Sequence, residues 1–176
     1  MGDIPAPIPG LVIRYAYLWK READCGQVEG RKNRPCVVVL CVEEIDGENV
    51  VTVAPITHSP PENPDQAIAL TPATRRRLGL DEEKNWIMAT EVNTFFWPGP
   101  DLASTPDGDY AYGELPAVVF EALVKKILDA GSDLPNVTQT VCWPHKPPQI
   151  SAVLRSHQQC GGGARAERRD RCEFQT

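Results

Sequence analysis

Residues 36–42 have the sequence CVVVLCV, and residues 50–56 have the sequence VVTVAPI. A continuous run of β-branched residues is typical of a strand that is buried on both faces. Asp46 and Gly47 lie between the two runs and form a strong signal for a hairpin turn. The pattern therefore predicts two antiparallel strands at the centre of a sheet.

Further strands are predicted on both sides of this pair. Residues Leu11–Trp19 alternate apolar and aromatic side chains, and Trp86–Val92 has the composition of a strand. The charged segment 20–34 is longer than most connections between strands and is a candidate functional loop. Several strands in close succession predict a small barrel or sandwich.

Two helices are expected among these strands. Thr71 and Pro72 have the residue types of a helix cap and a first helical position, which predicts a short helix over Ala73–Leu78. A second helix is predicted to begin at Leu115-Pro116 and to end at Gly131, because apolar residues recur between them at helical spacing. The predicted fold class is mainly β with helices (α+β).

Composition divides the 176-residue chain into two regions. Residues 9–130 contain all of the predicted elements and form one domain. Residues 131–176 are rich in polar residues, Pro, Gly and Cys, so we expect a flexible tail without a core of its own. The chain has no signal-peptide pattern and no apolar run near the roughly 18 residues of a membrane span, which favours a soluble, cytoplasmic protein.

The net charge of −6 disfavours a generic nucleic-acid coat protein. A polyanion would have to bind at a local basic site on an otherwise acidic body. The six cysteines, in a chain without a secretion signal, are interpreted as free thiols or metal ligands rather than as disulfides.

Three segments resemble a known family in their order and spacing: PGLV at residues 9–12, RPCVVV at residues 34–39 and VAPIT at residues 53–57. Together with the strand at 86–92 and the helix that follows Leu115, they are similar to the MazF/PemK family of toxin–antitoxin ribonucleases over roughly residues 9–130. The resemblance implies an SH3-like β-barrel of the MazF/PemK/CcdB type with a C-terminal helix. It also implies a homodimer, an antitoxin partner, and cleavage of single-stranded RNA without a metal or another cofactor.

Cleavage of RNA without a metal uses the 2′-hydroxyl of the substrate as the nucleophile. The enzyme has to activate that hydroxyl, stabilise the charge on the phosphorane and protonate the departing 5′ oxygen. The products are a 2′,3′-cyclic phosphate and a 5′-hydroxyl. A guanidinium, a hydroxyl and a carboxylate or imidazole are suited to these tasks.

The resemblance implies that Arg34 and Thr57 are catalytic residues. Arg34 ends the charged loop just before a buried strand, and its guanidinium can hold a phosphate bidentately. Thr57 follows the second strand, where its hydroxyl can bond a phosphate oxygen. The alternatives are a surface arginine at a strand edge and a threonine that forms a local turn.

Two further catalytic candidates are Glu91 and His58. Glu91 lies where some relatives have an Asp that acts as the general base, whereas Ala89 stands where relatives have an arginine. His58 supplies an imidazole, the side-chain type that most often transfers protons in enzymes. An outward-facing strand carboxylate and an uninvolved, exposed histidine are the alternatives.

A basic and polar surface is expected to bind the substrate. Its candidate residues are Glu29, Arg31, Lys32, Arg75, Arg76 and Arg77. Charged runs of this kind also occur as solvated faces. Trp19 and the aromatic residues at 95–97 are suited to stacking on unpaired bases, although such clusters more often pack in a core or an interface.

One pattern lies outside the family resemblance. Cys142, His145, His157 and Cys160 have residue types and a spacing that zinc accepts, but such spacing also arises by chance. The alternative to the nuclease is a non-catalytic barrel of the same fold that acts as a protein-binding module, either a gyrase-poison-like protein or a regulator.

Overall fold

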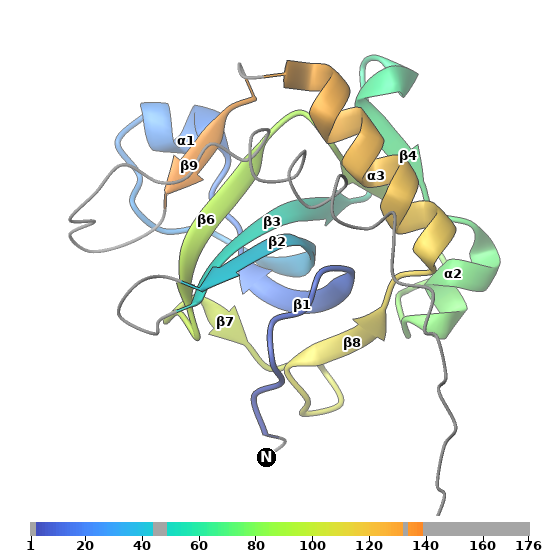
Figure 1. Cartoon of the computed structure of the whole chain (residues 1–176), viewed down its shortest axis with the longest axis horizontal. Coiled ribbons are helices and arrows are strands. Elements are labelled where there is room, and N and C mark those ends of the chain that lie inside the picture. The colour runs from blue at the N-terminus through green and yellow to red at the C-terminus, as the bar shows by residue number, and fades with distance from the viewer. Residues whose placement is uncertain (1–2, 44–48, 132–133, 139–176) are drawn as a thin grey trace, which may run out of the picture.

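The computed structural model describes residues 3–43, 49–131 and 134–138. In this part of the chain, strands form one sheet, with helices against its faces and ends (Figure 1). The elements, in chain order, are β1 (Leu11–Ala16), α1 (Lys20–Asp24), β2 (Asn33–Glu43), β3 (Asn49–Thr57), the 3-10 helix η1 (Pro64–Gln66), β4 (Ala67–Ala69), α2 (Pro72–Arg77), β5 (Trp86–Met88), β6 (Val92–Trp97), β7 (Leu102–Ala103), β8 (Ala111–Glu114), α3 (Ala117–Ala130) and β9 (Asn136–Thr138).

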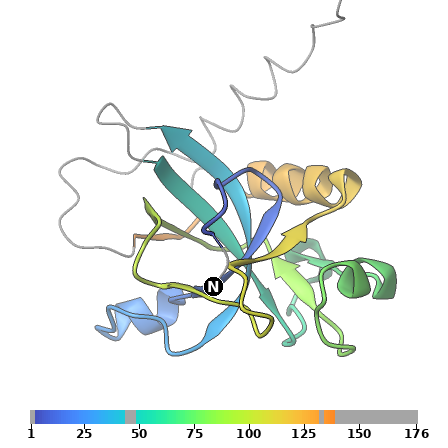
Figure 2. The same cartoon turned by 90° about the horizontal axis from the view of Figure 1, so that it is seen from below.

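The predicted central strand pair is confirmed. β2 pairs antiparallel with β3 along most of its length and with β1 on its other side. β1 continues to β7 and β8, and β3 continues to β5 and β6. Figure 2 shows β2 and β3 as long, curved strands that cross the centre of the molecule.

The predicted class, mainly β with helices, is also confirmed, but the strands do not close into a full barrel. Within the described residues, the order β4-β5-β3-β2-β1-β7 leaves β4 and β7 at opposite ends of the path. These two strands have 3 and 2 residues, so neither offers a long edge for closure. The sheet is therefore a curved, open relative of the expected barrel.

Both faces of the central strands are buried, as the apolar runs predict. Val37 and Ala54 belong to a core cluster under α3, whereas Val38 and Val53 belong to a second cluster on the opposite face. Because successive side chains of a strand alternate between faces, one pair of strands supplies both clusters. The second cluster also contains Tyr15, Tyr17, Cys36 and Phe95.

The helix α3 covers the first cluster. Leu123, Val124 and Ile127 are buried against the sheet, and Figure 1 shows the helix lying beside β4 and α2. Gly131, at the end of the helix, has φ of 77°, a conformation that glycine adopts without strain. None of the helices in the described ranges is both long and apolar enough to cross a membrane.

Two further differences from the sequence-based expectation concern the site. The strand expected over 86–92 is broken after Met88, and Ala89–Glu91 form a short irregular segment before β6. In addition, β9 comes from the region expected to be a tail, and it pairs in parallel with β6 beside α1. The folded unit thus continues beyond residue 130.

Candidate functional site

Arg34 and Thr57 lie at the same end of the central strand pair. The pairing of β2 with β3 begins at Cys36 and Pro55, so Arg34 lies two residues before the first paired residue of β2 and Thr57 two residues after the last paired residue of β3. Side-chain alternation directs both residues to the face of the second core cluster, which includes Cys36 and Val53. The two residues that the family resemblance identifies as catalytic therefore share one end and one face of the sheet.

The ring of Trp19 contacts two arginines at this site. The guanidinium carbon of Arg34 lies 4.9 Å from the centroid of the Trp19 ring, and that of Arg21 lies 5.9 Å from it. Tyr17 packs edge-on against the same ring, with centroids 5.1 Å apart. Stacking on an aromatic face orients a guanidinium without neutralising its charge.

The guanidinium of Arg34 forms no ion pair with any residue in the described part of the chain. Its Nε is buried and has no hydrogen-bond acceptor there. A cation that is held in place but has no anionic partner is suited to binding an anion such as a phosphate.

Glu91 is brought to the same cluster by the irregular segment that precedes β6. Its Oε1 accepts hydrogen bonds from the Tyr17 hydroxyl at 3.3 Å and from the Lys20 backbone amide at 3.1 Å. Tyr17 thus links the carboxylate to the Trp19 ring on which Arg34 stacks. The break in the predicted strand is what places Glu91 beside the start of α1.

Burial raises the pKa of Glu91 above its ordinary value. The two hydrogen bonds and the positive charge of Arg21 act in the opposite direction on this pKa, while the nearby Glu22 adds to the increase. A half-buried carboxylate with a raised pKa is a stronger base than an exposed one. Its chemistry fits the abstraction of a hydroxyl proton.

Thr57 has a local role that leaves its hydroxyl hydrogen available. Its Oγ1 accepts a hydrogen bond from the Ser59 amide at 3.2 Å, as expected for a threonine in a turn after a strand. A hydroxyl that accepts one bond can still donate its hydrogen to another acceptor. The turn and a phosphate contact are therefore compatible.

His58 is directed away from this cluster. Its Nε2 lies 3.1 Å from Asp81 Oδ1, and its Nδ1 lies 3.5 Å from Glu83 Oε2. Asn85 donates a further hydrogen bond to Asp81 at 3.1 Å. These contacts attach the imidazole to the loop between α2 and β5, and no contact in the described residues joins it to Arg34 or Glu91.

The loop residues expected to bind substrate are exposed beside the cluster. Glu29, Arg31 and Lys32 are solvent-exposed, and Arg31 donates from Nε to Gln27 at 3.0 Å. Burial raises the pKa of Asp101, and the negative charge of Glu29 raises this pKa further. Glu29 is thus close to the segment before β7 rather than to Glu91.

Gly30 anchors this loop against the end of β1. A Cβ at this position would lie 2.4 Å from the backbone oxygen of Ala16, a distance that no side chain tolerates. The loop backbone therefore approaches β1 as closely as glycine allows, next to Tyr17.

The three arginines of α2 differ in their surroundings. Arg75 donates from its Nη1 to the carbonyl oxygens of Glu82 and Glu83, which fixes the loop that holds His58. Arg76 and Arg77 are exposed. Arg75 therefore has a structural contact, whereas its two neighbours are free to meet a ligand.

The four zinc candidates, Cys142, His145, His157 and Cys160, lie outside the described residues. Within the described ranges, no cluster of three or more His, Cys, Asp or Glu side chains has the arrangement of a metal site.

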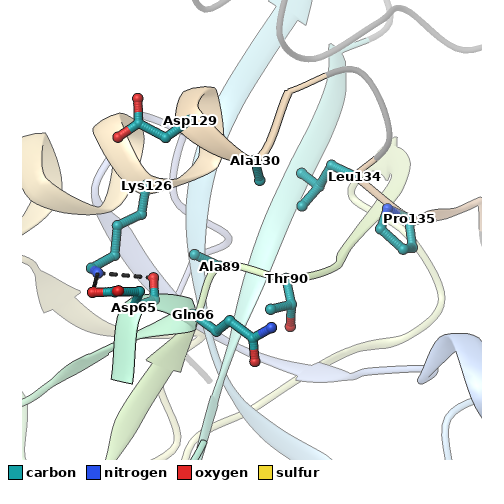
Figure 3. Close-up of a pocket in the computed structure, with 9 residues that line it drawn as sticks. All are labelled: Asp65, Gln66, Ala89, Thr90, Lys126, Asp129, Ala130, Leu134 and Pro135. Carbon is teal, nitrogen blue, oxygen red and sulfur yellow. Dashed lines mark hydrogen bonds and ion pairs between the residues drawn. The ribbon is translucent and has the colours of Figure 1, made fainter. Parts of the chain in front are cut away.

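A separate pocket of about 540 Å³ lies behind the Glu91 segment. Lys126 of α3 reaches across its edge and donates to the backbone oxygen of Asp65 at 2.8 Å (Figure 3). The lining residues are Asp65, Gln66, Ala89, Thr90, Lys126, Asp129, Ala130, Leu134 and Pro135. None of the catalytic candidates lines this pocket, but Ala89 and Thr90 connect it directly to Glu91.

Tyr17 is not among the site residues predicted from the sequence, and Trp19 is predicted in a different role. Trp19 is expected from sequence as a base-stacking residue, whereas in the structure two arginines contact its ring. The signal for Tyr17 was weak, since a tyrosine in an alternating strand is expected only to pack in the core.

The described site thus places an arginine without an ion-pair partner and a half-buried glutamate beside Tyr17 and Trp19, with a threonine at the same end of the central strand pair. Neither protein-family models nor curated proteins gave a match to the sequence. Among solved structures, the chain is similar to an endoribonuclease in complex with its cognate antitoxin from Mycobacterial species. The alignment covers 71% of this chain and 94% of the other, with 16% identity and a TM-score of 0.44.

Proposed function

We propose that this chain is a toxin-like endoribonuclease that cleaves single-stranded RNA without a metal. The observation that supports it best is that Arg34 and Glu91 both lie beside the Tyr17–Trp19 pair, with Thr57 at the same end of the central strand pair. The three side chains provide the cation, the hydroxyl and the base that the reaction needs.

The proposed reaction begins when Glu91 accepts the proton of the 2′-hydroxyl. The 2′ oxygen attacks phosphorus, the bond from phosphorus to the 5′ oxygen breaks, and the 5′ oxygen takes up a proton from solvent. The products are a 2′,3′-cyclic phosphate and a 5′-hydroxyl. Arg34 and the Thr57 hydroxyl stabilise the charge that develops on the phosphorane oxygens.

His58, one residue beyond Thr57, is the alternative source of the last proton. Its contacts to Asp81 and Glu83 favour a structural role, because they hold the imidazole at the loop before β5. Solvent is therefore the proton donor in this proposal.

Substrate binding in this proposal uses a small cationic area. Arg31 and Lys32 extend from the exposed loop next to Arg34, and Arg76 and Arg77 are exposed on α2. A small cationic area of this kind suits an RNA strand that is bound only briefly by a protein of net charge −6. We further propose a homodimer that a cognate antitoxin neutralises, as the family resemblance implies.

The test is to incubate the purified protein with single-stranded RNA in the presence of EDTA and to identify the new ends. We expect cyclic-phosphate and 5′-hydroxyl ends, and we expect that Arg34→Ala abolishes cleavage. Cleavage that requires an added metal would contradict the mechanism. RNA that stays intact after prolonged incubation would instead favour the non-catalytic, protein-binding alternative.

A further inference from the structure

The Tyr17 hydroxyl and the Lys20 amide donate to the same oxygen of Glu91. Both hydrogen bonds end on Oε1, at 3.3 Å and 3.1 Å. Within the described chain, no hydrogen bond is formed to Oε2. One oxygen of the carboxylate is thus fixed by the protein, and the other remains available.

We propose that Tyr17 is a positioning residue that holds Oε1 of Glu91, so that Oε2 receives the 2′-hydroxyl proton of the RNA. This inference rests on the nuclease function proposed above. In this proposal a buried tyrosine orients the carboxylate that acts as the general base. The hydrogen bond between Tyr17 and Glu91 then influences the pH range of cleavage.

The environment of Tyr17 makes its hydroxyl a constant donor. The side chain is fully buried, with 0% of its surface exposed, and a buried hydroxyl needs a hydrogen-bond partner. Burial and the adjacent Glu91 carboxylate raise the pKa of Tyr17 well above its ordinary value, so the phenol keeps its proton. The edge contact with Trp19 holds the ring in place.

The second donor is equally fixed. Lys20 is the first residue of α1, and the amides of Glu22 and Ala23 both donate to the Trp19 carbonyl, at 2.8 Å and 2.9 Å. These bonds set the orientation of the peptide that carries the Lys20 amide. Glu91 therefore rests against two rigid donors rather than against mobile side chains.

The charged groups around Glu91 determine which way its pKa moves when Tyr17 changes. Arg21 and Glu22 of α1 act on the carboxylate with opposite signs, and Arg34 faces the Tyr17 hydroxyl from β2. The Tyr17 hydrogen bond lowers the pKa of Glu91, against the effect of burial. Removing the hydroxyl should therefore raise this pKa further.

The experiment compares the wild-type protein with Tyr17→Phe, which keeps the ring and removes the hydroxyl. The Glu91 carboxyl carbon is titrated by NMR in the free protein, and the rate of RNA cleavage is measured against pH. We expect an upward shift of the Glu91 pKa, a matching shift of the acidic limb of the kcat profile, and a loss of about tenfold in kcat with KM nearly unchanged.

Tyr15→Phe is the matched control. Tyr15 lies on β1, two residues before Tyr17, and belongs to the same cluster. It is also fully buried, and it stacks on Phe95 with centroids 4.3 Å apart. The electrostatic partners that affect its pKa are Asp101 and Cys36 rather than Glu91. We expect this variant to leave the Glu91 titration and the pH profile of cleavage unchanged.

The outcomes separate this inference from the proposed function. An unchanged Glu91 pKa in folded Tyr17→Phe, with cleavage intact, would overturn the positioning role and leave the nuclease standing. A shifted pKa with an unshifted cleavage profile would also overturn it. If the wild-type protein does not cleave RNA, the nuclease proposal fails, and this inference fails with it.

Discussion

The guanidinium of Arg34 lies over the ring of Trp19, with 4.9 Å between the guanidinium carbon and the ring centroid. A cation–π contact of this kind contributes about 0.5–2 kcal/mol, according to how far it is removed from solvent. A carboxylate partner would orient the arginine as well, but it would also neutralise the charge. The aromatic partner keeps that charge available for a phosphate.

Substitutions at Arg34 should separate charge from geometry. Arg34→Ala should lower kcat by at least about 100-fold, because it removes a donor to the developing charge. Arg34→Lys keeps the charge but loses the planar fork, so it should have an intermediate effect. Single-turnover cleavage of a fluorescent RNA in EDTA measures both.

Arg14→Ala is the control for these variants. Arg14 lies on β1, and its Nη1 donates to the Ser104 carbonyl at 2.7 Å, away from the Trp19 ring. Its removal should leave cleavage unchanged. Equal losses in Arg14→Ala and Arg34→Ala would indicate a general electrostatic effect and would contradict a specific role for Arg34.

Glu91→Gln should abolish cleavage and alter the pH dependence of stability. Burial raises the pKa of Glu91 in the folded state, so the folded protein binds this proton more tightly than the unfolded chain does. As pH rises from the ordinary pKa of a glutamate through the raised value, this group lowers the free energy of unfolding. The glutamine cannot ionise, so its stability relative to wild type should increase over that interval.

Urea denaturation of wild type and Glu91→Gln at a series of pH values measures this effect. The glutamine oxygen can still accept from Tyr17 and Lys20, so the packing should be preserved. A stability difference that is constant with pH would contradict the raised pKa of Glu91.

His58→Gln tests the structural role that its contacts suggest. The glutamine can keep a hydrogen bond to Asp81 but cannot act as an acid at neutral pH. We expect a rate of cleavage within about threefold of wild type and an unchanged basic limb of the pH profile. A loss of 100-fold or more, the effect typical of removing a general acid, would identify His58 as the proton donor instead.

Gly30→Ala should destabilise the protein, because the added Cβ would meet the Ala16 backbone oxygen at 2.4 Å. Forced overpacking of this kind typically costs about 1–3 kcal/mol. The loop should move away from β1 and reduce RNA cleavage as well. Chemical denaturation and cleavage assays would report the two effects.

Gly26→Ala provides the comparison for this loop. Gly26 has φ of +85° and has no atom within 4 Å of an added Cβ, so its cost comes from backbone strain alone. It should destabilise the protein by about 1 kcal/mol and leave cleavage largely intact. Equal effects on cleavage in both variants would argue against a packing role for Gly30.

Asn136→Ala should weaken the attachment of β9. The Thr94 hydroxyl donates to Asn136 Oδ1 at 3.0 Å, and it also contacts the Thr52 hydroxyl at 3.0 Å. Losing the acceptor should cost about 1 kcal/mol of folding stability. Asn136→Asp keeps an acceptor oxygen and should recover most of this loss in urea denaturation, whereas equal losses would contradict the role of the hydrogen bond.

The central part of the fold was predictable because its signals are local. The apolar runs of β2 and β3 are long enough to identify strands, and α3 carries helical spacing together with a glycine at its end. The common position of Arg34 and Thr57 then follows from the antiparallel register of these two strands.

The break at Ala89–Glu91 was not predictable, because distant residues cause it. The Ala89 amide donates to the Gln66 carbonyl at 2.8 Å, and the Val92 amide donates to the Pro135 carbonyl at 3.0 Å. Neither partner can be inferred from the sequence around Glu91, which has the composition of a continuous strand. The contact with Tyr17 depends on the same break.

The strand β9 escaped prediction for a related reason. It has 3 residues, of which Val137 is the apolar one, and its partner β6 lies far from it in sequence. A segment this short has little intrinsic preference for a strand, so its conformation depends on the edge to which it is attached.

The order in which the chain is synthesised determines when β9 can pair with β6. Ribosomes make the chain from its N-terminus, so Asn136–Thr138 is the last described strand to emerge. Until then, β6 lacks its parallel partner along Val92–Thr94, and the Pro135 carbonyl cannot restrain the residue after Glu91. The segment that carries Glu91 would in this way reach its final position only after Pro135 and β9 have been synthesised.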